Sequence, residues 1–185
     1  MDVMLLSPTD LSKPMCLYKE DIAEVTLLSK EEFEQYKDVI RKPAYWWWLR
    51  SPDAHLTCGA AIVNNFGYVD YEFVHNTAGR IRPALRIPNL RYSNFKIGDR
   101  FGFIDNNIWT VISDELVLCD NSIGRTCFRE NWGAPDANDY NVSYVKYWLE
   151  EWAVYKGLHV NTLQVTSAFS SDEDMRNTLV DILTS

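Results

Sequence analysis

The segment that follows residue 28 has the apolar pattern of an amphipathic helix. Ser29 and Glu32 form an S-x-x-E capping box, in which each side chain satisfies a free backbone donor of the other, so a helix is predicted to begin at Lys30. Pro43 has no amide donor, and we expect the helix to end near Arg41. The apolar residues on its predicted buried face are Phe33, Tyr36, Val39 and Ile40.

A second helical pattern lies between Ser143, which suits a helix start, and Gly157, which suits a C-terminal stop. Its predicted apolar face consists of Val145, Trp148, Leu149, Trp152 and Tyr155. A third helix is predicted over 171–183, after a linker-like stretch at 159–170. The first turn of that helix is acidic, as the helix dipole favours.

Short runs of apolar residues between turn-forming residues predict β-strands. The predicted strands cover 24–28, 60–63, 68–74, 81–87, 100–104, 108–113 and 115–120. The turn at 64–67 predicts a hairpin, and Pro83 places its strand at a sheet edge or a bulge. The fold class is therefore α+β, with compact antiparallel sheets and two or three flanking helices. We expect one domain over 1–158 and an appended linker and helix over 159–185.

Two segments lack this periodicity. The first 20 residues predict an irregular arm that Leu5 and Leu6 could anchor. The polar stretch at 121–141 is longer than a simple connection needs, which predicts a functional or mobile loop.

Charge limits the class of partner. With 26 acidic and 18 basic residues, the formal net charge is -8 and the pI is about 4.9. This balance argues against a broad phosphate-binding surface and favours a basic protein as partner rather than nucleic acid. The sequence has neither an apolar run long enough to span a membrane nor a Sec-type signal, so we expect no membrane contact and a cytoplasmic location.

The sequence offers little catalytic chemistry. Phosphate-binding glycine loops and the hydrolase nucleophile elbow are missing, and His55, His75 and His159 lack metal-ligand spacing, so no metal or cofactor is expected. The four cysteines are widely spaced and are expected to be reduced thiols. A nucleophilic Cys58 is less plausible than a small buried cysteine.

Aromatic residues make up 14% of the chain, with seven Trp and ten Tyr. Such large side chains indicate either an aromatic core or an adhesive surface, and the sequence leaves open which tryptophans reach solvent.

A tryptophan signature gives a family resemblance. The run Trp46-Trp47-Trp48-Leu49-Arg50-Ser51-Pro52, followed by Arg82-Pro83-Ala84-Leu85, resembles the W-W-L-R-S-P and V-R-P-A-L motifs of the bacterial domain-of-unknown-function family six-two-seven-three. This resemblance covers 24–88. The segment 95–158 is similar to the half that usually precedes the signature, so the chain resembles a circular permutant of the family domain. A domain-swapped homodimer is the alternative.

The resemblance implies a C-type-lectin-like or sulfatase-modifying-like core. Its signature residues are Trp47, Trp48, Arg50, Arg82 and Pro83. We interpret them as structural: either Trp46 and Trp48 or else Trp47 face the core, and the two arginines bond backbone carbonyls or carboxylates and so link strands. Calcium-dependent sugar binding is not expected, because the Glu-Pro-Asn and Gln-Pro-Asp triplets are missing from the sequence.

Two functions remain open. The first is a non-enzymatic protein-binding module that presents the loops 53–58 and 121–141, most specifically an acidic, phage-type inhibitor of a nucleic-acid-binding nuclease, as in anti-CRISPR proteins. Residues that could imitate phosphates and contact the partner are Asp70, Glu72, Asp114, Glu115, Asp136, Asp139, Glu150, Glu151, Asp172, Glu173 and Asp174. A net charge of -8 is also typical of an ordinary soluble surface.

The second function is a lectin-like carbohydrate- or ligand-binding module, in which exposed Trp and Tyr stack on sugar rings. An enzyme similar to sulfatase-modifying oxidases would need a cysteine pair, for which Cys119 and Cys127 are a weak candidate. We therefore expect a protein that is not an enzyme.

Overall fold

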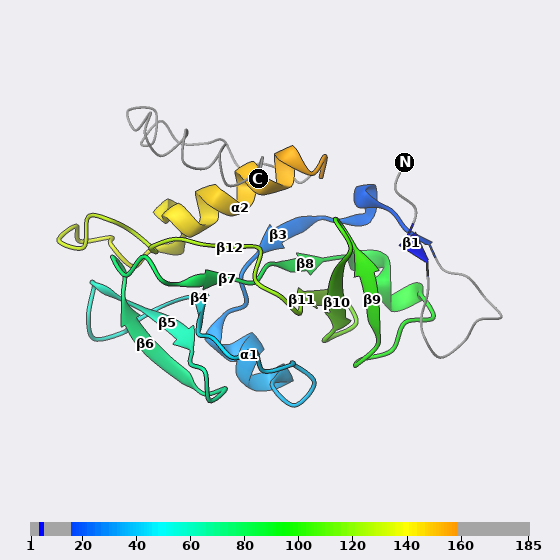
Figure 1. Cartoon of the computed structure of the whole chain (residues 1–185), viewed down its shortest axis with the longest axis horizontal. Coiled ribbons are helices and arrows are strands. Elements are labelled where there is room, and N and C mark those ends of the chain that lie inside the picture. The colour runs from blue at the N-terminus through cyan, green and yellow to red at the C-terminus, as the bar shows by residue number, and fades with distance from the viewer. Residues whose placement is uncertain (1–3, 6–15, 159–185) are drawn as a thin grey trace.

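The computed structural model describes residues 4–5 and 16–158, with side chains from residue 17 onward, and they form an α+β fold (Figure 1). The strands are β1 (Met4–Leu5), β2 (Cys16–Leu17), β3 (Glu24–Thr26), β4 (Trp47–Pro52), β5 (Gly59–Val63), β6 (Val69–Phe73), β7 (Arg80–Ile81), β8 (Ala84–Arg86), β9 (Arg100–Phe103), β10 (Asn107–Val111), β11 (Leu116–Cys119) and β12 (Gly124–Arg125). The helices are α1 (Lys30–Tyr36), α2 (Tyr144–Tyr155) and the short 3₁₀ turns η1 (Lys19–Asp21), η2 (Pro88–Tyr92) and η3 (Tyr140–Val142). The linker and helix predicted over 159–185 lie outside the described residues.

Two five-stranded sheets make up most of the fold. The first sheet has the strand order β3-β8-β11-β10-β9, and the second has the order β12-β7-β4-β5-β6. Strands β1 and β2 form a separate antiparallel pair. The predicted hairpin β5–β6 and the predicted meander β9–β10–β11 are both confirmed. One pairing departs from the expected antiparallel sheets, because β4 and β7 run parallel. Strand β6 already runs in the direction of β4, and residues 74–79 then cross back to the start of β4, where Arg80 pairs with Trp47.

The helices lie on opposite sides of these sheets, with α2 near β3 and α1 beneath β4 (Figure 1). Phe33 of α1 belongs to one core cluster, while Trp148 and Trp152 of α2 belong to the other. Strand β4 lies between the two clusters, so Trp47 packs in the α1 core and Trp48 in the α2 core. Both are fully buried, and the expectation that only one of the two faces the core is wrong, because both faces of the strand are covered over Trp47–Leu49.

Both predicted helix starts are confirmed. Ser29 accepts from the amide of Glu32, whose carboxylate accepts from the amide of Ser29, and Ser143 caps α2. Helix α1 ends at Tyr36 rather than near Arg41, because two tight turns follow it and turn Ile40 inward.

Helix α2 ends as predicted, with Gly157 in a left-handed conformation at φ 68°. Its predicted apolar face is wrong at one position. Tyr155, in the last turn, is 55% exposed, while Val145, Trp148, Leu149 and Trp152 are buried.

The single strand predicted over 81–87 is two strands. Between them, Arg82 and Pro83 carry the chain from the second sheet into the first. Strand β7 has β12 and β4 as neighbours, and β8 has β3 and β11. Of the two positions predicted for Pro83, a sheet edge or a bulge, the edge is therefore wrong. The proline is tolerated because it lies in the break between strands, where its missing amide interrupts neither sheet.

Candidate binding surface

Exposed aromatic rings gather at the end of the second sheet. Phe73, the last residue of β6, is 52% exposed and stacks on His75, with ring centroids 5.7 Å apart. His75 in turn lies 6.2 Å from the ring of Trp132, which is 58% exposed. Large exposed apolar side chains that touch one another are typical of interaction sites. We call Phe73, His75 and Trp132 the aromatic loop surface.

Hydrogen bonds join three chain segments beneath this surface. The side-chain amide of Asn138 donates to the carbonyl oxygens of Asp53 and Leu56, each at 3.1 Å. The amide of Arg129 donates to the carbonyl of Val74 at 2.9 Å. The two loops that the sequence predicted as a binding surface, 53–58 and 121–141, are therefore in direct contact.

The loop at 121–141 is well packed rather than loose. Phe128 is fully buried and meets Trp48 edge-on at 5.4 Å. The Arg129 guanidinium donates to the carbonyl of Val142 at 3.0 Å and pairs with Asp136 at 3.5 Å. The aromatic loop surface thus has a fixed support, which lowers the entropy lost when a partner binds.

Sequence reasoning missed the contribution of Phe73 and His75. Phe73 lies near the end of the strand predicted over 68–74, and His75 follows that strand directly. Their positions in the sequence do not distinguish them from residues of the core. The only available indication was position: β6 was predicted as the second arm of a hairpin, and the following polar residues Asn76 and Thr77 mark a turn at the surface.

Two of the acidic residues predicted to contact a partner instead accept hydrogen bonds from backbone amides of β6. The carboxylates of Asp70 and Glu72 accept from the amides of Tyr71 and Phe73, at 2.9 and 2.8 Å. Strand β6 is the outer strand of its sheet, and these amides face away from β5. Asp70 and Glu72 therefore cover backbone donors that would otherwise be open to strand pairing.

The remaining predicted acids lie on separate elements. Glu115 pairs with Arg86 at 3.5 Å and also with Arg91, and Glu150 pairs with Lys146 at 2.9 Å. Asp136 pairs with Arg129 as described, and Asp139 caps the turn η3. Asp114 is exposed in the turn between β10 and β11, and Glu151 is half-buried on α2. Asp172, Glu173 and Asp174 lie outside the described residues.

The signature arginines have structural partners. Arg50 pairs with Glu32 of the α1 capping box at 2.9 Å, which links β4 to α1. Arg82 donates through Nε to the carbonyl of Cys119 at 2.9 Å and through Nη1 to the carbonyl of Arg41 at 3.2 Å. These contacts are with a carboxylate and with backbone carbonyls, the partners expected from the sequence.

Two of the described cysteines, Cys119 and Cys127, have little nucleophilic character. Cys119 and Cys127 are buried, free thiols, and burial raises the pKa of both, that of Cys119 to about 11. Thiols with raised pKa are poor nucleophiles at neutral pH. Cys58 is a free, half-buried thiol in the 53–58 loop. Over residues 4–5 and 16–158, no group of three or more His, Cys, Asp or Glu side chains is placed to hold a metal ion.

Comparison with known proteins supports the family resemblance. Residues 2–89 match the family described as Domain of unknown function (DUF6273). The match contains the tryptophan signature and extends through the segment that the sequence suggested was only an arm. Neither the curated proteins nor the solved structures give a significant match. Within the described part of the chain, no helix is long and apolar enough to cross a membrane.

Proposed function

We propose that this protein is a non-enzymatic binding module that engages a protein partner through the aromatic loop surface. The observation that carries the proposal is the contact chain Phe73–His75–Trp132, exposed to solvent on a hydrogen-bonded support. Tryptophan is enriched among the residues that dominate binding energies at protein interfaces.

The ring geometry favours a protein over a sugar polymer. A flat polysaccharide-binding platform needs coplanar rings, whereas the planes of His75 and Trp132 are 49° apart. Rings at such angles form a shaped surface that can accommodate protein side chains from several directions. A lectin-like module remains the second candidate because Trp132 is exposed and could stack on a single sugar ring.

The acidic nuclease inhibitor is the narrower form of the same proposal. The net charge of -8 supports it, since an acidic protein is attracted to a basic groove. Glu115, Glu150 and Asp136 already have cationic partners on this chain, which leaves less charge for a partner. We therefore propose that the aromatic side chains contribute more to partner binding than the acidic side chains do.

We also propose that the chain is a circularly permuted domain with a C-type-lectin-like core. Pairing of β8 with β11 brings the segment 24–88 and the segment 95–158 into one sheet of one chain. This is the pairing between the two segments that permutation within one chain requires. In a lectin-like fold a variable loop surface binds the ligand, in agreement with the location proposed here.

The test is a pull-down from bacterial lysate at low and high salt with three forms of the tagged protein: wild type, Trp132→Ala and Tyr92→Ala. Tyr92 is 82% exposed on η2, which follows β8 of the first sheet, whereas the aromatic loop surface lies at the end of the second sheet; Tyr92 therefore serves as the matched control. We expect a protein retained by wild type and by Tyr92→Ala, but reduced at least about tenfold with Trp132→Ala.

Other outcomes separate the alternatives. Capture that is lost in salt and in Asp70→Lys/Glu72→Lys, but not in Trp132→Ala, would favour the acidic inhibitor. Binding on a glycan array that Trp132→Ala abolishes would favour the lectin-like module. Equal retention by all three forms would contradict a role for the aromatic loop surface.

A further inference from the structure

Strand β6 forms one outer edge of the second sheet, and within the described part of the chain only β5 pairs with it. With five residues it is the longest outer strand of the two five-stranded sheets, since β12 has two, β3 has three and β9 has four. An outer strand presents backbone donors and acceptors to which an extended chain can add itself as a further strand. The edge of β6 is therefore a place where the backbone of a partner can bind.

The outward backbone donors of β6 are held by carboxylates of the same strand. Asp70 accepts from the amide of Tyr71 at 2.9 Å, and Glu72 accepts from the amide of Phe73 at 2.8 Å. Within the described residues, no lysine or arginine forms a salt bridge with either acid, in contrast to the paired acids on other elements. Each of these two carboxylates is thus free to accept a cation from another molecule.

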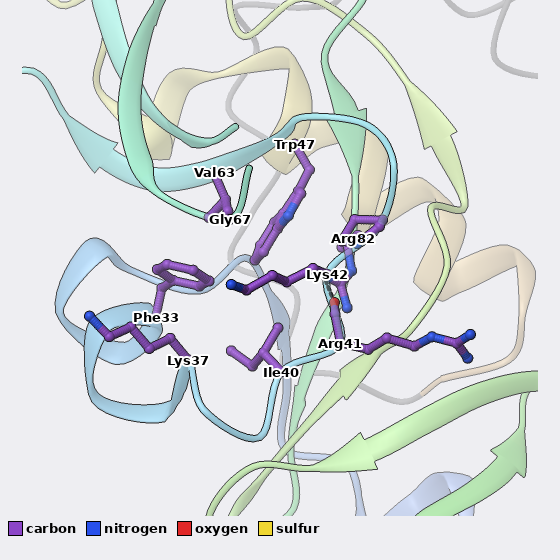
Figure 2. A pocket seen from close by; sticks show the side chains of 10 residues that line it. Phe33, Lys37, Ile40, Arg41, Lys42, Trp47, Val63, Gly67 and Arg82 are labelled. Carbon is purple, nitrogen blue, oxygen red and sulfur yellow. Dashed lines mark hydrogen bonds between the residues drawn. The ribbon is translucent and has the colours of Figure 1, made fainter. Parts of the chain in front are cut away.

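Two lysines lie close to β6, but tyrosines hold both of them. The Lys30 ammonium donates to the Tyr71 hydroxyl at 3.1 Å, and the Lys42 ammonium lies 5.9 Å from the Tyr68 ring centre. Figure 2 shows the Lys42 side chain beside Gly67, in the turn that precedes β6. The negative charge of the two acids at the edge is therefore left for a partner.

The side chains of β6 alternate between two faces of the sheet. Asp70 and Glu72 lie on one face, two residues and about 7 Å apart. Tyr71 and Phe73 lie on the other face and are 41% and 52% exposed. Residues directly opposite each other on adjacent strands share a face. A strand added to β6 therefore meets the two acids with every second side chain and the two rings with the side chains between.

We propose that β6 binds an extended segment of the partner in which lysine or arginine alternates with apolar residues. The segment adds antiparallel to β6, and its carbonyl oxygens accept from the amides of Tyr71 and Phe73 in place of the Asp70 and Glu72 carboxylates. The released carboxylates pair with the cationic side chains opposite them. A segment without these cations would leave the displaced carboxylates uncompensated, which makes the edge selective.

This edge is continuous with the aromatic loop surface. Phe73 is the last residue of β6 and also the first ring of the chain Phe73–His75–Trp132. A segment that lies along β6 is thereby brought to the other two rings. The inference rests on the proposed function, because it states the form of the protein partner that the same surface binds.

The first test is a titration with the capped peptide Thr-Lys-Val-Lys-Val-Lys-Thr, followed by ¹⁵N–¹H NMR of the backbone amides. The control peptide has the same sequence with both valines N-methylated, so that it keeps its charge but loses the donors that face β6. We expect the first peptide to shift the amide signals of Tyr71 and Phe73 saturably and to bind at least about tenfold more tightly than the control. No shift at about 1 mM peptide, or equal affinities, would overturn the proposal.

A second test removes the outward donor from the protein. Tyr71→Pro lacks the amide that points away from β5, so the pairing of β5 with β6 is kept. Tyr71→Ala loses the same ring but keeps the amide, and is the matched control. We expect the peptide to bind Tyr71→Ala at least about tenfold more tightly than Tyr71→Pro. Equal affinities would show that the peptide does not pair with this edge.

The role of charge is tested with Asp70→Asn/Glu72→Gln, which keeps an oxygen over each amide but removes both charges. Asp114→Asn/Glu151→Gln removes the same charge from other elements and is the matched control. The peptide should bind the β6 variant at least about fivefold more weakly than the control variant. Equal affinities would contradict a local role of the two β6 acids.

The lysate pull-down distinguishes this inference from the proposed function. We expect Tyr71→Ala to retain at least about tenfold more of the captured protein than Tyr71→Pro. If Tyr71→Pro retains as much as Tyr71→Ala while Trp132→Ala loses the protein, the aromatic loop surface binds the partner but strand addition is wrong.

Discussion

The indole nitrogen of Trp48 donates a hydrogen bond of 2.9 Å to the carbonyl oxygen of Thr126. This contact joins the central strand β4 to the segment that leads to the aromatic loop surface. It depends on a close approach, because a Cβ atom at Gly79 would lie 1.8 Å from the Trp48 Nε1. Position 79 must therefore lack a side chain.

Gly79→Ala should destabilise the protein by at least about 2 kcal/mol, because Trp48 is fully buried and has no space to move. Urea unfolding followed by tryptophan fluorescence measures the change. The matched control is Gly133→Ala, where the nearest atom to a new Cβ is 3.8 Å away and the expected change is below about 0.5 kcal/mol. Equal effects at the two glycines would contradict the proposed packing.

Local features of this fold were predictable from the sequence. The capping box at Ser29 and the helix stop at Gly157 depend on residues within one turn of the chain, and both occur as predicted. Hairpin β5–β6 was predictable for the same reason, since the left-handed Gly67, at φ 84°, lies inside the turn that it makes.

Long-range features were not predictable. At Pro83 the chain passes from one sheet to the other. This passage depends on β11, because the Cys119 amide donates a hydrogen bond to the Pro83 carbonyl, 36 positions earlier in the sequence. Likewise, Phe128 and Trp132 lie in the same polar loop, yet Phe128 is fully buried and Trp132 is 58% exposed, because Phe128 packs on the distant Trp48 of β4. Exposure of the candidate site therefore had to come from the structure.

Asn138 is expected to hold the 53–58 loop in place. Its Asn138→Ala variant loses two hydrogen bonds to that loop, and amide hydrogen exchange at 53–59 should become about tenfold faster. The amides of β10 and β11, which lie in the other sheet, should keep their rates. Asn131→Ala, at an exposed position of the same segment, is the control. Uniform acceleration throughout the protein would indicate global destabilisation instead.

Thiol reactivity should separate Cys58 from the buried cysteines. In a Cys16→Ser background, we expect the native protein to show one reactive thiol with Ellman's reagent, because Cys58 is half-buried while Cys119 and Cys127 are buried. Adding Cys58→Ser should remove the native reaction, and urea should expose the other two thiols. Rapid native reaction of a second thiol would contradict the burial of Cys119 or Cys127.

Alkaline pH should weaken the fold through Cys119. Burial raises the pKa of this thiol to about 11, whereas in the unfolded chain it has its ordinary value of 9.0. Between these values the unfolded state loses a proton that the native state keeps, so the free energy of unfolding falls as the pH rises from about 9 to 11. Below pH 9 both states keep the proton and this contribution is constant.

Two units of pKa correspond to a loss of about 2–3 kcal/mol by pH 11. Burial also raises the pKa of Tyr140 above its ordinary value of 10.0, so its hydroxyl adds to the loss at higher pH. Urea unfolding at pH 8, 9 and 10 in wild type and Cys119→Ala measures the effect of the thiol. The alanine variant is less stable at pH 8 because it leaves a small cavity, but its stability should fall less steeply above pH 9. If the two proteins lose stability in parallel between pH 9 and 10, the Cys119 thiol titrates alike in the folded and unfolded states, and the proposed pKa difference is wrong.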